Sequence, residues 1–233
     1  MKTCPEKFRL LTCLTFLALI RATGLSSSVP DADVRLNHWL TAQTNFTSWR
    51  ADFIQTRSLK ALTQPLISHG RIWFVAPNLF RWELGVPAKS VALRTESDLI
   101  VLAPSLKRAE RYPISEMAKG PIKGLASLMD TGFPRDATAF KKHFEMLGAD
   151  ETNGVCNFRF APRESAIRKL LPELSIGVSL HDFSLRTTSL QFADGSILRN
   201  DFTNSEVNPR IDPALFVAPL DAQWKVTEPM KQL

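Results

Sequence analysis

The sequence lacks the residue groupings on which most enzymes and metal proteins depend. Its four histidines are far apart along the chain, and it has no His-Glu-x-x-His, Cys-x-x-Cys or Gly-x-Ser-x-Gly motif and no Gly-rich phosphate loop. Two acidic pairs, Asp31/Asp33 and Asp150/Glu151, fall where a helix start and a turn explain them. We therefore expect no catalytic residue, no metal site and no cofactor.

The sequence also has no apolar run long enough for a comfortable membrane span, which takes about 20 residues. Leu10 to Ile20 is the main run, and polar residues interrupt it. Basic residues precede the run, and the small and polar stretch from Arg21 to Ser28 follows it. That order is typical of a secretory signal peptide, which we predict to be residues 1–28. Cys13 lies inside the apolar run, where it is badly placed for lipid attachment.

Cysteine, linkers and strong charge are scarce as well. Removal of residues 1–28 from the 233-residue chain leaves 205 residues and Cys156 as the one cysteine, so no internal disulfide is expected. No Gly/Ser-rich or charged linker divides residues 29–233, which predicts a single domain.

The formal net charge of +6 falls to +3 without the signal peptide, because that segment holds four basic residues and one acidic residue. So small a positive charge does not favour nucleic acid as a partner.

The stretch from Gly70 to Pro87 contains the clearest pattern. It predicts two strands joined by a Pro-Asn turn. In the second strand Phe80, Trp82 and Leu84 share one face, while Arg81 and Glu83 share the other. The pattern predicts one bulky apolar face and one face in water. Either the protein's own core or a guest molecule must cover the apolar face.

Further strands dominate the rest of the chain. The predicted hairpins turn at residues 150–154 and at Asp194-Gly195. Helices are expected at residues 31–43, 122–129 and 166–171, and a short turn or helix at residues 212–216. We count about ten to eleven strands, and helices this short cannot cover so wide a sheet. The expected fold is mainly β (α+β): a half-open antiparallel β-barrel whose short helices form a lid, or a sandwich.

Several segments, taken in order, resemble the bacterial outer-membrane lipoprotein carrier (LolA-like) family. Ala51–Gln55 looks like that family's first strand with its Phe-x-Gln signature, and Gly70–Phe74 looks like the second. Pro77–Glu83 looks like its distinctive turn and third strand, and Asn204–Pro219 looks like its closing segment. The resemblance implies a periplasmic carrier that shelters the acyl chains of a lipoprotein, or of another lipid, between the inner and outer membranes.

The resemblance also implies a cavity, a lid and partners. Inner-membrane donor and outer-membrane acceptor proteins would bind transiently to a monomeric carrier. The family's carriers have an arginine just before the turn proline, where this chain has Ala76, so we expect a differently latched lid and leave the cargo open between a lipoprotein and another lipid. The expected cavity residues are Phe53, Trp73, Phe74, Phe80, Trp82, Leu93 and Phe158, and the expected lid residues are Ile122, Leu125 and Leu128.

Two alternatives remain open at this point. Each apolar strand residue has an ordinary role as filler of a closed barrel core. The same fold also serves as a periplasmic sensor or interaction module that does not transport. A hydrolase would need a nucleophile and a base, for which the sequence offers no candidate.

Overall fold

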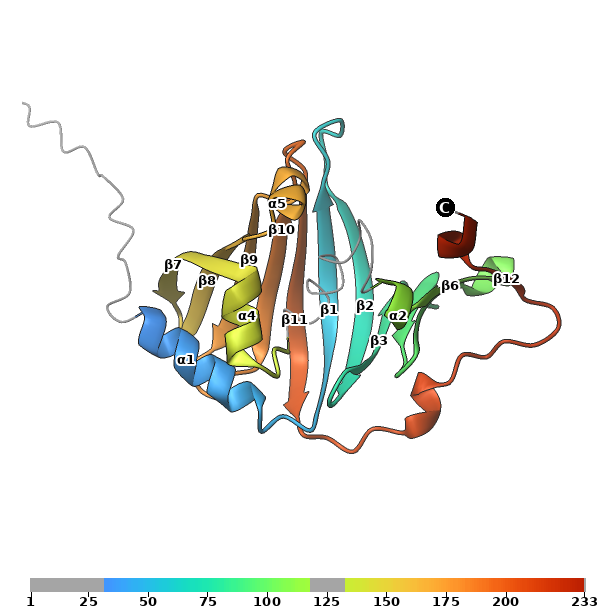
Figure 1. The fold of residues 1–233 in the computed structure, drawn as a ribbon, viewed down its shortest axis with the longest axis horizontal. Helices are drawn as coiled ribbons and strands as arrows, with labels where there is room; N and C mark the ends of the chain where they lie inside the picture. The colour runs from blue at the N-terminus through green and yellow to red at the C-terminus, as the bar shows by residue number, and fades with distance from the viewer. Residues whose placement is uncertain (1–31, 118–132, 233) are drawn as a thin grey trace, which may run out of the picture.

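The computed structural model describes residues 32–117 and 133–232 (Figure 1). The predicted signal peptide and the predicted lid residues Ile122, Leu125 and Leu128 lie outside these ranges, so both stay predictions. Within the described ranges, no helix combines the length and the apolar character that a membrane crossing requires.

In the described ranges, the strands form a single open sheet of twelve. Its order is β12-β6-β5-β4-β3-β2-β1-β11-β10-β9-β8-β7, and the two end strands, β12 and β7, do not pair with each other. Neighbours are antiparallel except β12, which runs parallel to β6. The strands are β1 (Ser48–Ser58), β2 (Leu66–Val75), β3 (Leu79–Leu84), β4 (Ser90–Arg94), β5 (Asp98–Ala103), β6 (Arg108–Pro113), β7 (Phe144–Thr152), β8 (Val155–Pro162), β9 (Glu173–Ser179), β10 (Leu185–Gln191), β11 (Ile197–Val207) and β12 (Lys225–Thr227).

The helices that the structure describes are short. They are α1 (Ala32–Gln43), α2 (Ile114–Met117), α4 (Ala137–His143) and α5 (Ser165–Leu170), with 3-10 turns η1 (Pro104–Leu106), η2 (Pro213–Phe216) and η3 (Pro229–Gln232). The prediction of a mainly β, half-open antiparallel sheet is confirmed. The twelfth strand was not expected, because its three residues give no alternation to detect.

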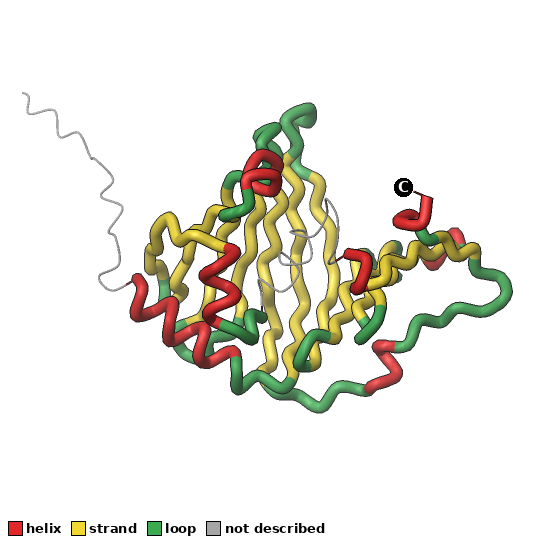
Figure 2. Tube along the Cα trace, viewed as in Figure 1, coloured by secondary structure: helices red, strands yellow, loops and turns green. Residues whose placement is uncertain are grey.

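The sheet is bent, so it has an inner and an outer face. The β7–β10 and β3–β6 ends form two wings, and α1 and α4 lie against the β7–β10 wing (Figures 1 and 2). We call the face toward these helices the inner face; it carries Phe53, Phe74 and Trp82. The outer face carries Trp73 and Leu93.

Aromatic packing fills the inner face beneath the helices. Trp39 of α1 is fully buried between Phe140 of α4, at 5.8 Å between ring centroids, and Phe158 of β8, at 6.0 Å. Arg135 precedes α4, and its guanidinium donates to the backbone oxygens of Gln43, the last residue of α1, and of Phe46 in the turn that follows. These bonds hold the start of α4 against the end of α1.

The predicted hairpins are confirmed, and each uses a suitable turn residue. Thr152 pairs with Val155 across Asn153-Gly154, where both residues have positive φ, at 52° and 72°. Gln191 pairs with Ile197 across the turn that contains Asp194 and Gly195. Asn and Gly tolerate this left-handed region, so the local sequence determines both registers.

The outer face of β2–β6 is covered by the chain's own C-terminal segment. After β11 the backbone passes along this face and returns to pair with β6 (Figure 1). Phe216 packs there against the cluster that contains Leu93 and Leu102. The face of β3 that we expected in water is therefore covered: Glu83 is only 8% exposed, and Arg81 donates both to Glu83 and to the backbone oxygen of Leu215.

Candidate functional site

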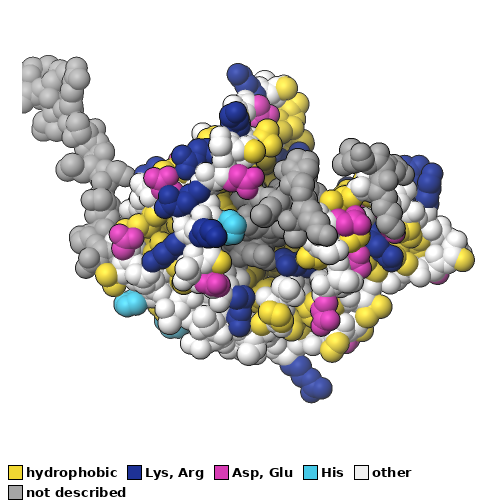
Figure 3. All heavy atoms as spheres, in the orientation of Figure 1, with side chains coloured by type: hydrophobic (Ala, Val, Ile, Leu, Met, Phe, Trp, Pro, Cys, Tyr) yellow, Lys and Arg dark blue, Asp and Glu magenta, His cyan; other side chains and the backbone are white. Residues whose placement is uncertain are grey.

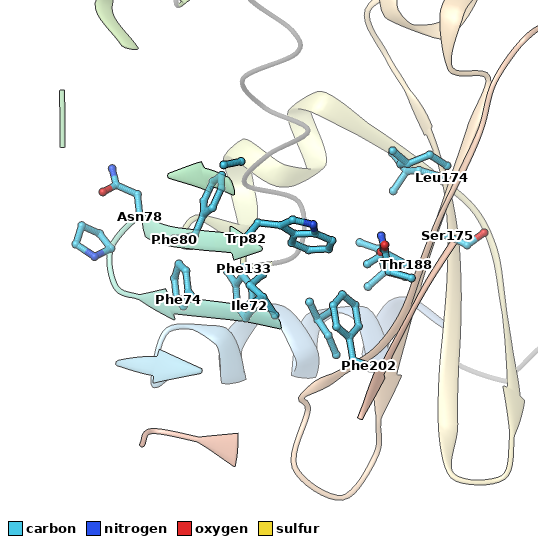
Figure 4. Close-up of a pocket in the computed structure, with 16 residues that line it drawn as sticks. Ile72, Phe74, Asn78, Phe80, Trp82, Phe133, Leu174, Ser175, Thr188 and Phe202 are labelled. Carbon is cyan, nitrogen blue, oxygen red and sulfur yellow. The ribbon is translucent and has the colours of Figure 1, made fainter. Parts of the chain in front are cut away.

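An apolar pocket of about 320 Å³ opens on the inner face between the two wings. This volume lies at the lower end of the range of about 300–1,000 Å³ that is usual for small-ligand pockets. Figure 4 shows Phe80 and Trp82 approaching from β3 and Leu174 and Thr188 from β9 and β10. The lining residues are Ile72, Phe74, Pro77, Asn78, Phe80, Trp82, Ala92, Phe133, Leu174, Ser175, Ile176, Leu185, Thr188, Leu190, Asn200 and Phe202.

A close approach of strands positions the aromatic wall. Gly70 of β2 lies opposite Phe53, and a Cβ atom at Gly70 would lie 2.1 Å from the Phe53 ring and 2.3 Å from the Glu83 backbone oxygen. Glycine is therefore required at this position. The Phe53 ring in turn lies 4.1 Å from the ring of Trp82, measured between centroids. Because Phe53 is fully buried and packs against Trp82, it fixes the position of the Trp82 ring at the pocket.

Phe133 adds a further aromatic wall from outside the sheet. Its ring stacks on Phe74 at 4.2 Å, with the two planes 7° apart, and contacts Trp49 at 5.0 Å. Ala76 precedes the turn proline and is partly buried against the inner core.

The structure divides the seven predicted cavity residues into three groups. Phe74, Phe80 and Trp82 line the pocket. Phe53 and Phe158 are fully buried in the inner core, the first behind Trp82 and the second against α1. Trp73 and Leu93 lie on the outer face, in or against the second core, and the structure does not bring them to the pocket.

The opposite wall of the pocket was not foreseen as such. Leu174 and Ile176 alternate along the chain as in a strand, and Leu190 and Phe202 flank the predicted hairpin turn at Asp194-Gly195, but no local pattern links these residues to Phe80. The link comes from pairing of β1 with both β2 and β11, which brings residues about 150 positions apart into register. A parity count on each strand would have found the inward residues once this pairing was known.

A second hollow of about 340 Å³ continues from the pocket toward α4. The two share Pro77, Asn78 and Phe133. Unlike the pocket, the second hollow has charged or ionisable residues in its lining: Arg94, Arg135, Asp136 and His143. The space-filling view shows basic, acidic and histidine side chains on this side of the molecule (Figure 3). The apolar pocket beside the polar second hollow suits an amphipathic ligand.

Reactive side chains are scarce around this site. The described residues contain no group of three or more His, Cys, Asp or Glu side chains arranged for a metal ion. Cys156 is fully buried, and burial raises the pKa of its thiol to about 11, so it is neutral and unreactive near neutral pH. The chemistry that the pocket offers is therefore apolar contact and neutral hydrogen bonding.

A bent, open antiparallel sheet with an apolar chamber between its wings is an architecture that can hold an apolar ligand. The family model described as "Outer membrane lipoprotein carrier protein LolA" matches residues 44–219, and the chain belongs to that family. The resemblance seen in the sequence is thereby confirmed. The family is one of carriers rather than enzymes, and its carriers are periplasmic.

Individual relatives are distant. An outer-membrane lipoprotein carrier protein of Coxiella burnetii (strain CbuK_Q154) is 24% identical over 218 residues, which cover 89% of this chain and 92% of the relative. Among solved structures, an uncharacterized conserved protein from Thermus thermophilus superposes with a TM-score of 0.51 at 10% identity, over 84% of this chain and 99% of that one. At this identity the structural likeness shows the fold alone.

Proposed function

We propose that this protein is a periplasmic carrier that shelters the acyl chains of a lipoprotein, or of another lipid, during transfer between the inner and outer membranes. The observation that supports the proposal most directly is the partly vacant apolar pocket in a chain of the LolA family. Exposing an acyl chain to water costs about 0.8 kcal/mol per methylene. A carrier must therefore offer a dry chamber and later give up its guest.

The pocket meets both requirements. Its walls come from two wings that do not pair with each other, because the sheet is open between β12 and β7. A small change in the angle between the wings would widen the chamber without breaking a β-ladder. Donor and acceptor proteins at the two membranes would bind the monomeric carrier transiently, and the second hollow would face the polar part of the cargo.

The decisive experiment identifies what the protein carries. Protein purified from a periplasmic extract is treated with organic solvent, and the extract is analysed by mass spectrometry; we expect a co-purifying acylated lipid or lipoprotein. Leu190→Glu, which places a carboxylate in the pocket wall, should remove it. Ser189→Glu places the same charge on the opposite face of β10 and serves as the control.

The outcomes separate the candidate functions. An extract without lipid from the wild-type protein, together with no uptake of an acyl probe, would refute the carrier proposal. Uptake without transfer of the probe between two vesicle populations would instead favour the sensor or interaction module.

A further inference from the structure

Three polar side chains cross the inner face as one row, which we call the polar row: Gln55, Asn200 and Thr188. The strand registers place Gln55 of β1 opposite Asn200 of β11, and Asn200 opposite Thr188 of β10. Two positions away in one direction, Phe53 pairs with Phe202; in the other direction, Leu198 of β11 lies between Leu190 of β10 and Arg57 of β1. Asn200 and Thr188 are therefore polar members of a mostly apolar pocket lining.

The members of the polar row are hydrogen-bonded in one direction. The Gln55 amide nitrogen donates to the Asn200 side-chain oxygen at 3.0 Å, and the Asn200 amide nitrogen donates to the Thr188 hydroxyl oxygen at 3.0 Å. Gln55 is 8% exposed and Asn200 is 6% exposed, so water does little to solvate them. Such bonds offset the cost of burying amides, which is about 1–3 kcal/mol for each group left unsatisfied.

The row ends in a donor at the pocket. Thr188 accepts the Asn200 bond through its oxygen, and in the part of the chain that the structure describes its hydroxyl donates no bond. Both Asn200 and Thr188 line the pocket, and Figure 4 shows Thr188 on the wall that faces Trp82. The hydroxyl hydrogen can therefore point to an acceptor inside the chamber.

The charge of the chamber limits what that acceptor can be. Among the described residues that line the pocket none is charged; ionisable side chains line the second hollow, and Arg57 lines a separate hollow beside Gln55. A free carboxylate beside Thr188 would be desolvated without a counter-ion, which is costly, whereas a neutral carbonyl oxygen needs one donor. A bare hydrocarbon would leave the donor unused.

We propose that the polar row recognises the neutral carbonyl of an ester- or amide-linked acyl chain, so that the pocket selects acyl derivatives over hydrocarbons and free fatty acids. This inference rests on the proposed carrier function and adds the residues that recognise the linkage of the acyl chain. Thr188 would donate to the carbonyl oxygen, while Asn200 and Gln55 would orient the Thr188 hydroxyl by occupying its acceptor site.

The test is displacement of the neutral dye N-phenyl-1-naphthylamine from the full chain. The competitors are methyl myristate, N-methyl myristamide, tetradecane and myristate, each delivered from cyclodextrin. Thr188→Val keeps the side-chain shape and removes the hydroxyl. We expect it to weaken methyl myristate or N-methyl myristamide about three- to tenfold, which corresponds to one neutral hydrogen bond, and to leave tetradecane unchanged. If only the ester or only the amide binds more weakly to the variant, that linkage is the one that the polar row recognises.

Thr187→Val is the matched control, because Thr187 precedes Thr188 on the same strand and points to the opposite face, toward Gly177. It should leave all four affinities unchanged. Asn200→Leu should reproduce the Thr188→Val pattern if it folds, and the Thr188 variant alone decides the question if it does not.

The outcomes separate the two proposals. A wild-type chain that binds neither the dye nor any competitor contradicts the carrier function itself. A wild-type chain that binds them, but whose ratio of ester or amide to tetradecane is unchanged in Thr188→Val, overturns the polar-row inference alone and leaves the row a purely structural device. A loss of affinity for myristate as large as that for the ester also overturns the inference, because the row would then read a carboxylate.

Discussion

Strands β2–β4 have an apolar cluster on each face, and the two clusters are covered in different ways. On the outer face, the C-terminal segment from Ile211 to Trp224 lies over Leu93 and its neighbours. Arg81 fixes that segment by donating to the Leu215 backbone oxygen at 3.0 Å. On the inner face, Phe80 and Trp82 are only partly buried, and they border a chamber of about 320 Å³.

This difference shows that apolar character alone does not identify a binding residue. Trp73 and Phe74 are neighbours of similar size, yet one packs on the outer face and the other lines the pocket. The face to which a side chain points, and the amount of chain that returns to cover that face, decide its role. Substitutions of the same kind should therefore affect protein stability and ligand affinity differently on the two faces of these strands.

The largest effect is expected from Leu93→Ala on the outer face. Leu93 is fully buried, so its truncation leaves a cavity that should lower the free energy of unfolding by about 2–5 kcal/mol. Urea denaturation measures this loss. Binding of an acyl probe to the folded variant should not change, because Leu93 does not reach the pocket. A weakened probe affinity in the folded variant would contradict the separation of the two faces.

A pair of enlargements should shift stability in opposite directions. Ala109 of β6 is 1% exposed in the outer core, so Ala109→Leu should overpack it and cost about 1–3 kcal/mol. Ala92 of β4 lines the pocket opposite Trp82, so Ala92→Leu should fill vacant space and stabilise by about 0.5–2 kcal/mol. Thermal unfolding of the two variants compares them directly. Destabilisation by both would mean that the inner face is as fully packed as the outer one.

Phe80→Ala tests the inner face by removing an aromatic ring from the pocket wall. Phe80 is half-buried and borders open space, so the cost in stability should be about 1–2 kcal/mol, below the range for a fully buried ring. Probe affinity should fall about tenfold, since the ring contributes apolar contact to the guest. Dye titration and urea denaturation of the same sample give both numbers. An unchanged affinity with a large loss of stability would make Phe80 a core residue.

Local patterns in the sequence predicted most of the elements. Alternation gave β3, turn residues gave both hairpins, and the helix expected at residues 31–43 contains α1. Helix α4 was missed, although Asp136 is an N-cap signal that accepts from the backbone nitrogens of Thr138 and Ala139. With seven residues, α4 has too few turns for helical periodicity to be detected beside the strong strand pattern that follows it.

The two faces could not be assigned from local patterns. Parity puts Arg81 and Glu83 together, but whether water or protein covers them depends on a segment more than a hundred residues later. The same long-range closure decides that Leu93 belongs to the outer core. The polar row depends on a different long-range contact, the pairing of β1 with β11, which brings Gln55 and Asn200 together.

A labelling experiment sharpens the contrast within the inner face, between its filled end and its vacant one. Cys156 lies in the filled end, and Ala92→Cys places a thiol on the pocket wall. In a chain that has Cys4→Ser and Cys13→Ser, iodoacetamide should modify Cys156 more than about a hundredfold more slowly than the unfolded chain, because access requires core opening. In the same background with Cys156→Ala, the thiol of Ala92→Cys should react readily, and methyl myristate should protect it.

The pH dependence of the same thiol follows from its burial. Because burial raises the pKa of Cys156 to about 11, the folded state favours the neutral thiol. Its contribution to stability is therefore complete below the pKa of the unfolded thiol and is lost as the pH rises toward the folded value. Urea denaturation should show a steeper loss of stability across that alkaline range in the wild-type chain than in Cys156→Ala. Equal slopes would mean that Cys156 is solvated, and that the end of the inner face beneath α1 is as open as the pocket.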